Sequence, residues 1–472
     1  MWRVYLAELR DSWPAWLGVS LTFIVTNLSF ANSSLVLASG WAAVGSGQLA
    51  LNDSAEFTAA PITNYVFSAI VALVVISGGA RMVVDSRRGA LARLALAGAS
   101  PRQVIASVLV QLAAVSLACA VIADVIALVT LDPYLGFLTT GVESGLEIAK
   151  PAPVYALGQM LLANLGVVAV ALIGGYSQAR RAAAVTPVEA LRQASGGTEF
   201  RMRPVRWVFA ILGGLLLIGL FAAIGPIASA RTSETVSTLL QLSIVALMVF
   251  VVVVSLLAPL LIGPLTQAWT RILPIPDPAW TLTRLNLAAR GAQFARSAVP
   301  VIFTVGLMFG LLSIFPTIYA TSLINEFPGG VVTLDKANLG AVLSLVGPAL
   351  AIALAGAVGN VFMMSKRRDA ELALLGITGA TPGQRQRMAV LEALILTVTS
   401  TMLGLLAYAV MAGYLALSFS QAGYTPALSV PVSAWLVAVL GTTLVLVAAT
   451  YLPTLRALGQ PEPRVVAAMV GQ

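Results

Sequence analysis

Residues 104–130 read VIASVLVQLAAVSLACAVIADVIALVT, an apolar run with a single charged side chain, Asp124. A helix of about 20 apolar residues crosses the hydrocarbon core of a bilayer, so this run is long enough to span a membrane. The whole chain has the same character, with 59% hydrophobic and 10% charged residues among 472. Soluble domains are about 45–50% apolar and about 25% charged. The composition excludes a soluble fold and predicts an all-α polytopic membrane protein.

Ten apolar runs alternate with short segments that hold most of the charge. The basic residues lie on one side of the threaded chain except for Lys150, Arg231 and Lys336, as the positive-inside rule requires when both termini are cytoplasmic. The predicted spans are residues 15–39, 63–82, 104–130, 154–176, 207–228, 237–264, 298–320, 339–363, 388–412 and 432–453.

The side-chain inventory excludes several classes of function. The chain has no His and one Cys, Cys119, which removes imidazole bases, His/Cys zinc sites and intrachain disulfides. The net charge of +8 follows from basic residues that flank the spans, so we expect no nucleic-acid partner. We therefore expect a non-enzymatic chain with no cofactor or metal of its own.

An internal repeat divides the chain. A shift of 281 positions pairs residues 78–103 with 359–384, and ten of the paired residues are identical, which is more than this skewed composition gives by chance. The repeat predicts two parallel four-span units joined by spans five and six, as in transporters built from two related halves. The predicted domains are residues 1–195, 196–275 and 276–472, the first and last being the four-span units with amphipathic lead-ins.

The repeated inner loop has a defined local chemistry. A glycine tolerates the left-handed conformation that ends a helix, and Ser or Thr followed by Pro and Gln predicts a capping box at the next helix start. The first copy has Gly98, Ala99, Ser100, Pro101, Arg102 and Gln103, and the second has Gly379, Ala380, Thr381, Pro382, Gly383 and Gln384.

Charged side chains precede each of these breaks, on a segment whose other face is apolar. Such an amphipathic segment fits a groove on a partner protein, although a single copy could equally serve only to start the next span. The charged residues are Arg87, Arg88 and Arg93 in the first copy, and Lys366, Arg367, Arg368, Asp369 and Glu371 in the second.

These loops, the Arg284–Leu287 lead-in and the basic tail at 180–192 resemble the FtsX-type permease domain, whose members include MacB-, LolC/LolE- and BceB-type subunits. The ten-span plan is most similar to the BceB group. The resemblance implies that loops 83–103 and 364–386 are coupling helices seated on two copies of a separate ATPase, which binds ATP and Mg. It also implies a substrate cavity between the first two spans of each unit.

The sequence departs from that family at the outer side. Family members usually carry a large extracytoplasmic domain, where this chain has only residues 40–62 and 321–338. The chain also lacks the Gly-x-x-x-x-Gly-Lys-Ser/Thr phosphate loop, so ATP hydrolysis is expected in a partner.

Three polar residues within the spans are further candidates. Asp124 in span three is a functional candidate because ionisable groups at membrane depth usually serve function, although it could simply reach outer water. Gln111 and Glu392 occupy matching positions in spans three and nine, where we expect a structural contact to the inner loop.

These observations favour the permease of an ATP-driven exporter or extractor in a bacterial cytoplasmic membrane. Its substrate would be hydrophobic or amphipathic, such as a drug, an antimicrobial peptide or a lipid. Two alternatives stay open: a mechanotransmitting or sensing complex that regulates a partner, and an ion-coupled secondary transporter, for which Asp124 alone is thin support.

Overall fold

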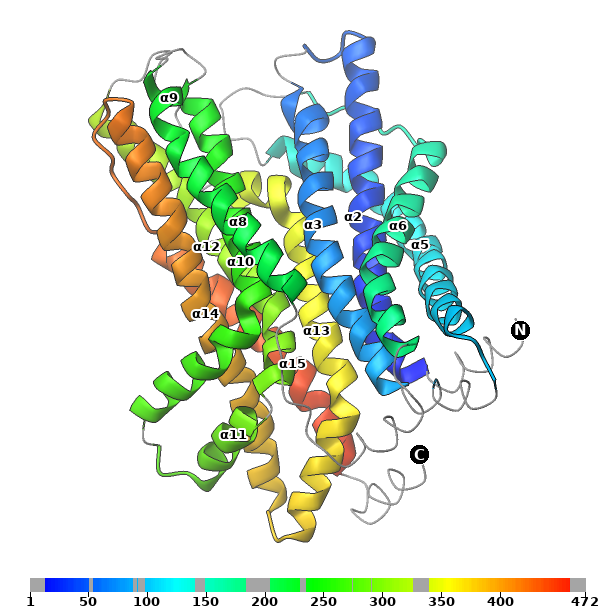
Figure 1. Cartoon of the computed structure of the whole chain (residues 1–472). Coiled ribbons are helices and arrows are strands. Elements are labelled where there is room, and N and C mark those ends of the chain that lie inside the picture. The colour runs from blue at the N-terminus through cyan, green and yellow to red at the C-terminus, as the bar shows by residue number, and fades with distance from the viewer. Residues whose placement is uncertain are drawn as a thin grey trace. The chain divides into compact units, whose positions relative to one another are not determined.

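The computed structural model is built of helices throughout the residues that it describes (Figure 1). We found no strand within those residues, as an all-α membrane protein requires. The described residues are 13–50, 54–87, 91, 98–140, 149–183, 204–229, 235–273, 275–289, 291–325 and 339–458.

Nine of the ten predicted spans coincide with a helix or a pair of consecutive helices, and the span predicted at 154–176 begins three residues before its helix. The polytopic all-α prediction is confirmed. In the described part of the chain nine helices are long and apolar enough to cross a membrane, and a tenth, α13, contains the shorter apolar stretch Gly347–Met363. The helices are α2 (Trp13–Gly45), α3 (Ala55–Ser86), α5 (Pro101–Thr140), α6 (Leu157–Ala183), α8 (Pro204–Ala222), α9 (Ile224–Ser229), α10 (Thr235–Ile272), α11 (Pro278–Ala289), α12 (Gly291–Ile324), α13 (Leu339–Ile377), α14 (Pro382–Gln421) and α15 (Val432–Leu458).

Several helices are longer than the spans predicted for them. Helices α5 and α14 have 40 residues each, and α14 begins 281 positions after α5, which is the displacement of the sequence repeat. At 1.5 Å per residue each is about 60 Å long. Because the hydrocarbon core is only about 30 Å thick, both helices continue beyond it.

Helix α13 joins two features that the sequence treats separately. Its 39 residues include the eighth predicted span and the charged segment 366–371 after it. The expectation of a separate short helix before Gly379 is therefore wrong for the second copy. The reason is local, since no glycine or proline interrupts residues 361–375.

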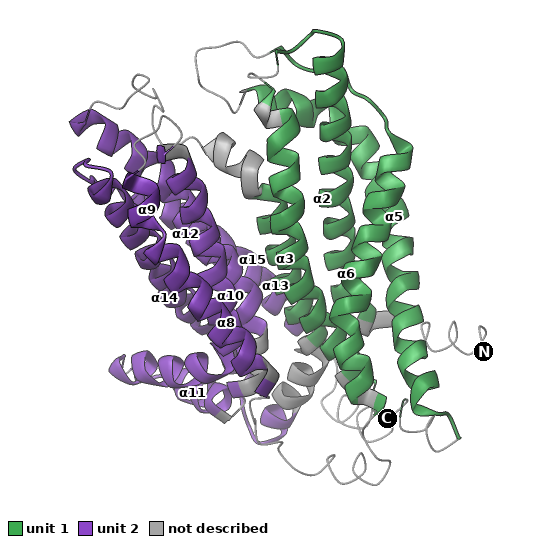
Figure 2. Cartoon of the chain, turned by 45° about the horizontal axis from the view of Figure 1, so that its top comes forward, with its two compact units in different colours: residues 1–142, 147–200, 343–366 green, residues 143–146, 201–342, 367–472 purple. Residues whose placement is uncertain are grey.

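The helices pack into two compact units, coloured separately in Figure 2. Unit 1 is residues 1–142, 147–200 and 343–366, and unit 2 is residues 143–146, 201–342 and 367–472. Residues 343–366 of α13 thus belong to unit 1, although they follow unit 2 helices in the chain. The three-part division drawn from the repeat concerns sequence similarity and stays a prediction.

In unit 1, α2 lies at the centre and packs against α3, α5 and α6. It also crosses α13 at backbone contact distance, because a Cβ atom at Gly18 would lie 2.2 Å from the carbonyl oxygen of Gly359. Further along, Ser29 Oγ is 3.4 Å from the Pro348 carbonyl oxygen. The α2 numbers rise while the α13 numbers fall, so the helices run antiparallel with small residues between them, as is typical of close helix pairs in membranes.

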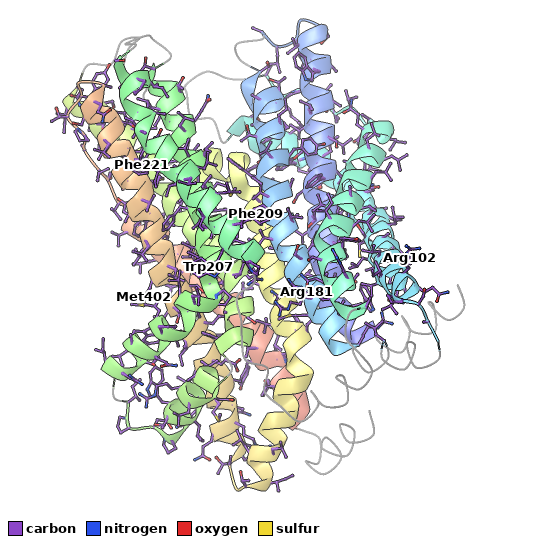
Figure 3. The ribbon with its side chains drawn as sticks, viewed as in Figure 1. Arg102, Arg181, Trp207, Phe209, Phe221 and Met402 are labelled. Atoms are coloured by element: carbon purple, nitrogen blue, oxygen red, sulfur yellow. The ribbon has the colours of Figure 1, made fainter. Side chains whose placement is uncertain are left out.

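In unit 2, α12 takes the central position and packs against α10, α14 and α15. Of its most apolar 18-residue segment, 83% is buried. Glycines again permit the close approaches: a Cβ at Gly404 would lie 3.3 Å from the Gly306 backbone nitrogen, and Gly310 meets the Leu247 side chain. In the span Arg206–Ser229, which includes α8, only 11% of the most apolar 18-residue segment is buried. Helix α8 packs on α10 and α9 and exposes most of its apolar surface, including Trp207 and Phe209 (Figure 3).

The amphipathic lead-in predicted around Arg284–Leu287 is helix α11. Asp277 caps its start by accepting the Ala279 N–H at 2.9 Å. Trp280 is buried and meets Trp269 of α10 edge to face, at 6.0 Å between ring centroids. The Trp269 indole N–H in turn donates to Thr399 of α14 at 3.0 Å, so α11 is held against α10 and α14.

The Gly18–Gly359 crossing predicts a large difference between two glycine substitutions in unit 1. Gly18→Val should lower the thermal unfolding temperature of the purified chain, because the side chain would enter the α13 backbone and overpacking costs about 1–3 kcal/mol. Gly166→Val on α6 is the matched control, since a Cβ there meets no atom within 4 Å. Equal unfolding temperatures for the two variants would contradict the crossing.

Candidate functional site

The inner breaks before α5 and α14 have the same backbone geometry. Gly98 and Gly379 have φ values of +92° and +101°, in the left-handed region that favours glycine. At the second break the Gly379 N–H donates to Gly376 O at 3.0 Å and the Ala380 N–H to Leu375 O at 2.8 Å. This pair of bonds is a Schellman motif, which satisfies the last carbonyls of α13.

The predicted capping boxes are present in both copies. Thr381 Oγ1 accepts the Gln384 N–H at 3.3 Å, and the Gln384 side chain accepts the Thr381 N–H at 2.9 Å. Ser100 and Gln103 make the same two bonds, at 3.4 and 2.8 Å, and Pro101 and Pro382 are the first residues of α5 and α14. The two breaks are therefore fixed turns with satisfied backbone groups.

Most residues of the breaks face outward. Gly98, Ser100, Pro101 and Arg102 are exposed in the first copy, and Gly379, Thr381 and Pro382 in the second, while Ala99 and Ala380 are half-buried. Arg102 extends from the start of α5 in Figure 3. This exposure leaves both turns accessible to a partner.

The charged residues predicted for docking are distributed differently. Arg87 is 7% exposed, and its guanidinium donates to the side-chain oxygen of Gln111, which is 1% exposed. Arg87 is thus turned onto α5 and not outward toward a partner. Arg367, Arg368, Asp369 and Glu371 lie on α13, whereas Arg88 and Arg93 lie outside the described residues.

The second copy has a buried arginine that sequence reasoning missed. Arg385 is 5% exposed and lies in the first turn of α14. Its backbone N–H donates to the Thr381 carbonyl oxygen at 3.1 Å. A signal existed in the sequence, because Arg385 shares a helix face with Met388 and Ala389, three and four residues on, and both are buried. A buried guanidinium therefore lies next to each break, supplied by different positions.

The intramembrane candidates do not converge on one site. Gln111 joins Arg87, and Glu392 lies half-buried on α14, 281 positions later. Asp124 accepts a hydrogen bond from Asn164 of α6, with 2.8 Å between Asn164 Nδ2 and Asp124 Oδ2. Asn164 was missed, although it is the one amide in an otherwise apolar stretch of α6, residues 160–173.

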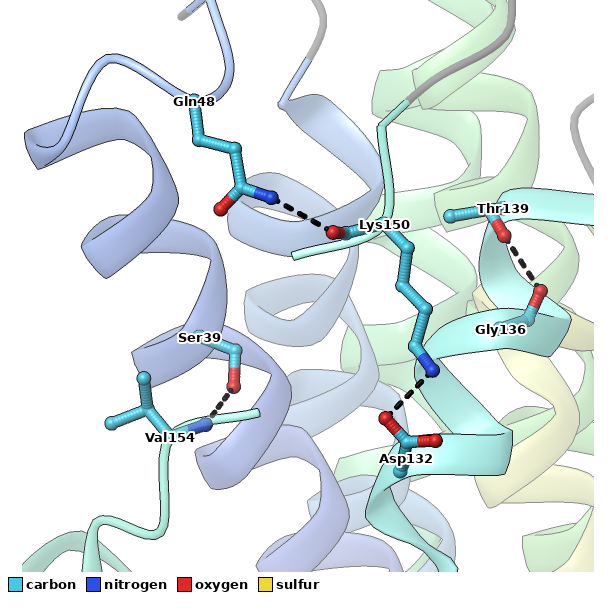
Figure 4. A network of polar contacts seen from close by, with 7 residues as sticks. All are labelled: Ser39, Gln48, Asp132, Gly136, Thr139, Lys150 and Val154. Atoms are coloured by element: carbon cyan, nitrogen blue, oxygen red, sulfur yellow. Dashed lines mark hydrogen bonds and ion pairs between the residues drawn. The ribbon is translucent and has the colours of Figure 1, made fainter. Parts of the chain in front are cut away.

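A polar network closes the other end of unit 1 (Figure 4). Lys150 Nζ lies 2.6 Å from Asp132 Oδ1 on α5, and the Lys150 carbonyl accepts from Gln48 at 3.0 Å. The Val154 N–H donates to Ser39 Oγ on α2 at 2.9 Å. These contacts fix the segment that leads into α6. The exposed ion pair itself contributes little, about 0–1 kcal/mol.

The two turns make a specific prediction for glycine replacement. Gly379→Ala should destabilise the second loop by about 1–2 kcal/mol, because a Cβ is disfavoured at positive φ. Gly383→Ala, four residues on and inside α14 with open space around it, should be neutral or stabilising. Hydrogen exchange across residues 374–386 measures both effects, and similar exchange rates in the two variants would refute the assignment.

The Arg87–Gln111 contact predicts a non-additive pair of substitutions. Gln111→Leu should destabilise the chain by about 1–3 kcal/mol, because the buried guanidinium of Arg87 loses one of its hydrogen bonds. The loss in Arg87→Met/Gln111→Leu should be smaller than the sum of the two single losses. A double-mutant cycle on the unfolding temperature gives the coupling. Additive effects would mean that the two side chains do not interact.

Comparison with known proteins finds a family match that covers the second inner loop. Residues 342–461 match the FtsX-like permease C-terminal domain, a range that covers most of α13, the second inner loop, α14 and α15. A search of curated proteins gives no match to the chain. The second repeat unit therefore contains an FtsX-like permease C-terminal domain, and this match supports an FtsX/MacB-type permease in a multi-pass membrane chain.

Proposed function

We propose that this permease exports or extracts a hydrophobic or amphipathic molecule, with two copies of a separate ATPase docked on its inner loops. The observation that carries the proposal is the match at residues 342–461, which contains the loop at Gly379–Gln384. The loop at Gly98–Gln103 has the same left-handed glycine and the same capping box. Two loops of one construction suit two copies of one partner.

The construction of the loops suits the transmission of force. The Schellman motif and the capping box leave few free backbone groups between α13 and α14, so the turn is stiff. Helix α13 contributes residues 343–366 to unit 1 and residues 367–377 to unit 2. ATP-driven displacement of this turn would therefore act on helices of both units.

The short outer connections support a membrane-embedded substrate. Residues 46–54 join α2 to α3, and residues 325–338 join α12 to α13. Each is far shorter than the 50 or so residues that an independent domain needs. We infer that the substrate reaches the helices laterally from the bilayer of a bacterial cytoplasmic membrane.

Reversal of loop charge tests the docking. The tagged chain is co-purified with candidate ATPases, and ATP hydrolysis is measured for the wild type and for Arg88→Glu/Glu371→Arg. We expect the wild type to capture an ATPase and the double variant to lose at least tenfold in both capture and activity, because opposite charges must face each other at the interface. Addition of amphiphiles to the wild-type complex should raise its hydrolysis rate.

The matched control is Asp132→Lys/Lys150→Asp, which exchanges an exposed ion pair near the opposite end of α5 from Pro101. This exchange should leave capture and hydrolysis unchanged. Docking on the inner loops would be contradicted if the control also lost activity, or if the loop variant kept full capture and hydrolysis. If no amphiphile changes the rate of ATP hydrolysis by the complex, the result would favour regulation of a partner over transport.

A further inference from the structure

We propose that Asp124 and Asn164 form a partly buried proton-binding site between α5 and α6, at which Asp124 holds the proton in the resting protein. This inference concerns the chain alone and does not depend on the identity of the ATPase.

The contact between the two side chains is one-sided. Asn164 Nδ2 donates to Asp124 Oδ2 at 2.8 Å, and Asn164 is 4% exposed. The other oxygens, Asp124 Oδ1 and Asn164 Oδ1, are both buried and have no hydrogen-bond partner among the described residues. One acceptor is thus left over on each side chain.

A single proton satisfies both acceptors. A protonated carboxyl has one O–H donor and keeps its acceptor capacity, while an amide offers both a donor and an acceptor. With the proton on Oδ1, Asp124 can donate to Asn164 Oδ1 while Oδ2 accepts from Asn164 Nδ2. The pair then forms a closed acid–amide ring, in which each of the three oxygens and the amide nitrogen makes one hydrogen bond.

Within the residues that the structure describes, no positive charge pairs with Asp124. Helix α2, which packs on α5, has no titratable or charged residue over Trp13–Gly45. On α6 the first such residue after Asn164 is Tyr176, more than three turns away. On α3, the hydroxyl of Tyr65 is bonded to Ser34 and to the Phe30 carbonyl.

The remaining titratable residues on α5 near Asp124 are already accounted for. Cys119 is a buried thiol and adds no positive charge. Asp132, two turns along, is paired with Lys150. On the lipid side the neighbouring residues Val121, Ile122 and Val125 are exposed and apolar. A carboxylate at this depth would cost several kcal/mol, whereas the neutral acid avoids most of that cost.

The position of the pair links its protonation to helix movement. Asp124 is 23 residues, about 35 Å, along the helix that begins at the first inner loop. If α5 shifts against α6, the ring opens and Asp124 loses the amide that holds its proton. Proton binding would then follow the packing of these two helices.

Infrared spectroscopy of the full chain in lipid nanodiscs tests the proposal. We expect a carboxylic-acid C=O band at pH 8, where an exposed Asp is ionised. The band should be absent in Asp124→Asn, whose amide keeps the ring without a titrating group, and should remain in the matched control Asp132→Asn. Asn164→Leu should move the band to higher frequency, because the acid C=O loses its donor.

The outcomes separate cleanly. A band that is lost with Asp124→Asn and shifted with Asn164→Leu supports the site. An identical carboxylic-acid C=O region for the wild type and Asp124→Asn at pH 8 would mean that Asp124 carries no proton, and would overturn the proposal. If Asp124→Asn does not fold, the presence or absence of the shift in Asn164→Leu decides alone.

Discussion

In the hydrocarbon core of a bilayer a backbone N–H or C=O must find its partner within the protein, and a continuous helix is the simplest way to provide it. This constraint determines where the chain can turn. Breaks fall where local residues replace the lost bonds, as Gly379, Thr381 and Gln384 do between α13 and α14. Where such residues are missing the helix continues, and α13 therefore runs through its charged segment to Ile377.

The same solvent changes how helices hold together. Lipid is as apolar as a leucine side chain, so association depends on close contact and on hydrogen bonds between helices. Glycines at 18 and 359 bring two backbones together in unit 1, and those at 306 and 404 do so in unit 2. The hydroxyls of α2 are satisfied largely by the carbonyls one turn back, as with Thr22 and Thr26. Those groups need no partner across the bundle.

Local features of the fold could be predicted from the sequence, because each depends on residues a few positions apart. The spans follow from apolar run length, and the turns at Gly98 and Gly379 with their capping boxes follow from residue order. The burial of Arg87 could not be predicted, since it depends on Gln111, 24 positions away on another helix. The pairing of Asp124 with Asn164 could not be predicted for the same reason, since 40 positions separate the two residues. The close contacts of Gly356 with Val75 and of Gly359 with Gly18 could not be predicted either, because they join residues far apart in the sequence.

The crossing of α2 and α13 has a mechanical consequence. Gly359 lies near the middle of α13, 18 residues or about 27 Å from Ile377 and a similar distance from Leu339. At that point the two backbones touch and cannot move closer. Pro348 interrupts the outer arm of α13, whereas residues 359–377 contain no proline. A push on the inner end of α13 would therefore press on α2 at this contact.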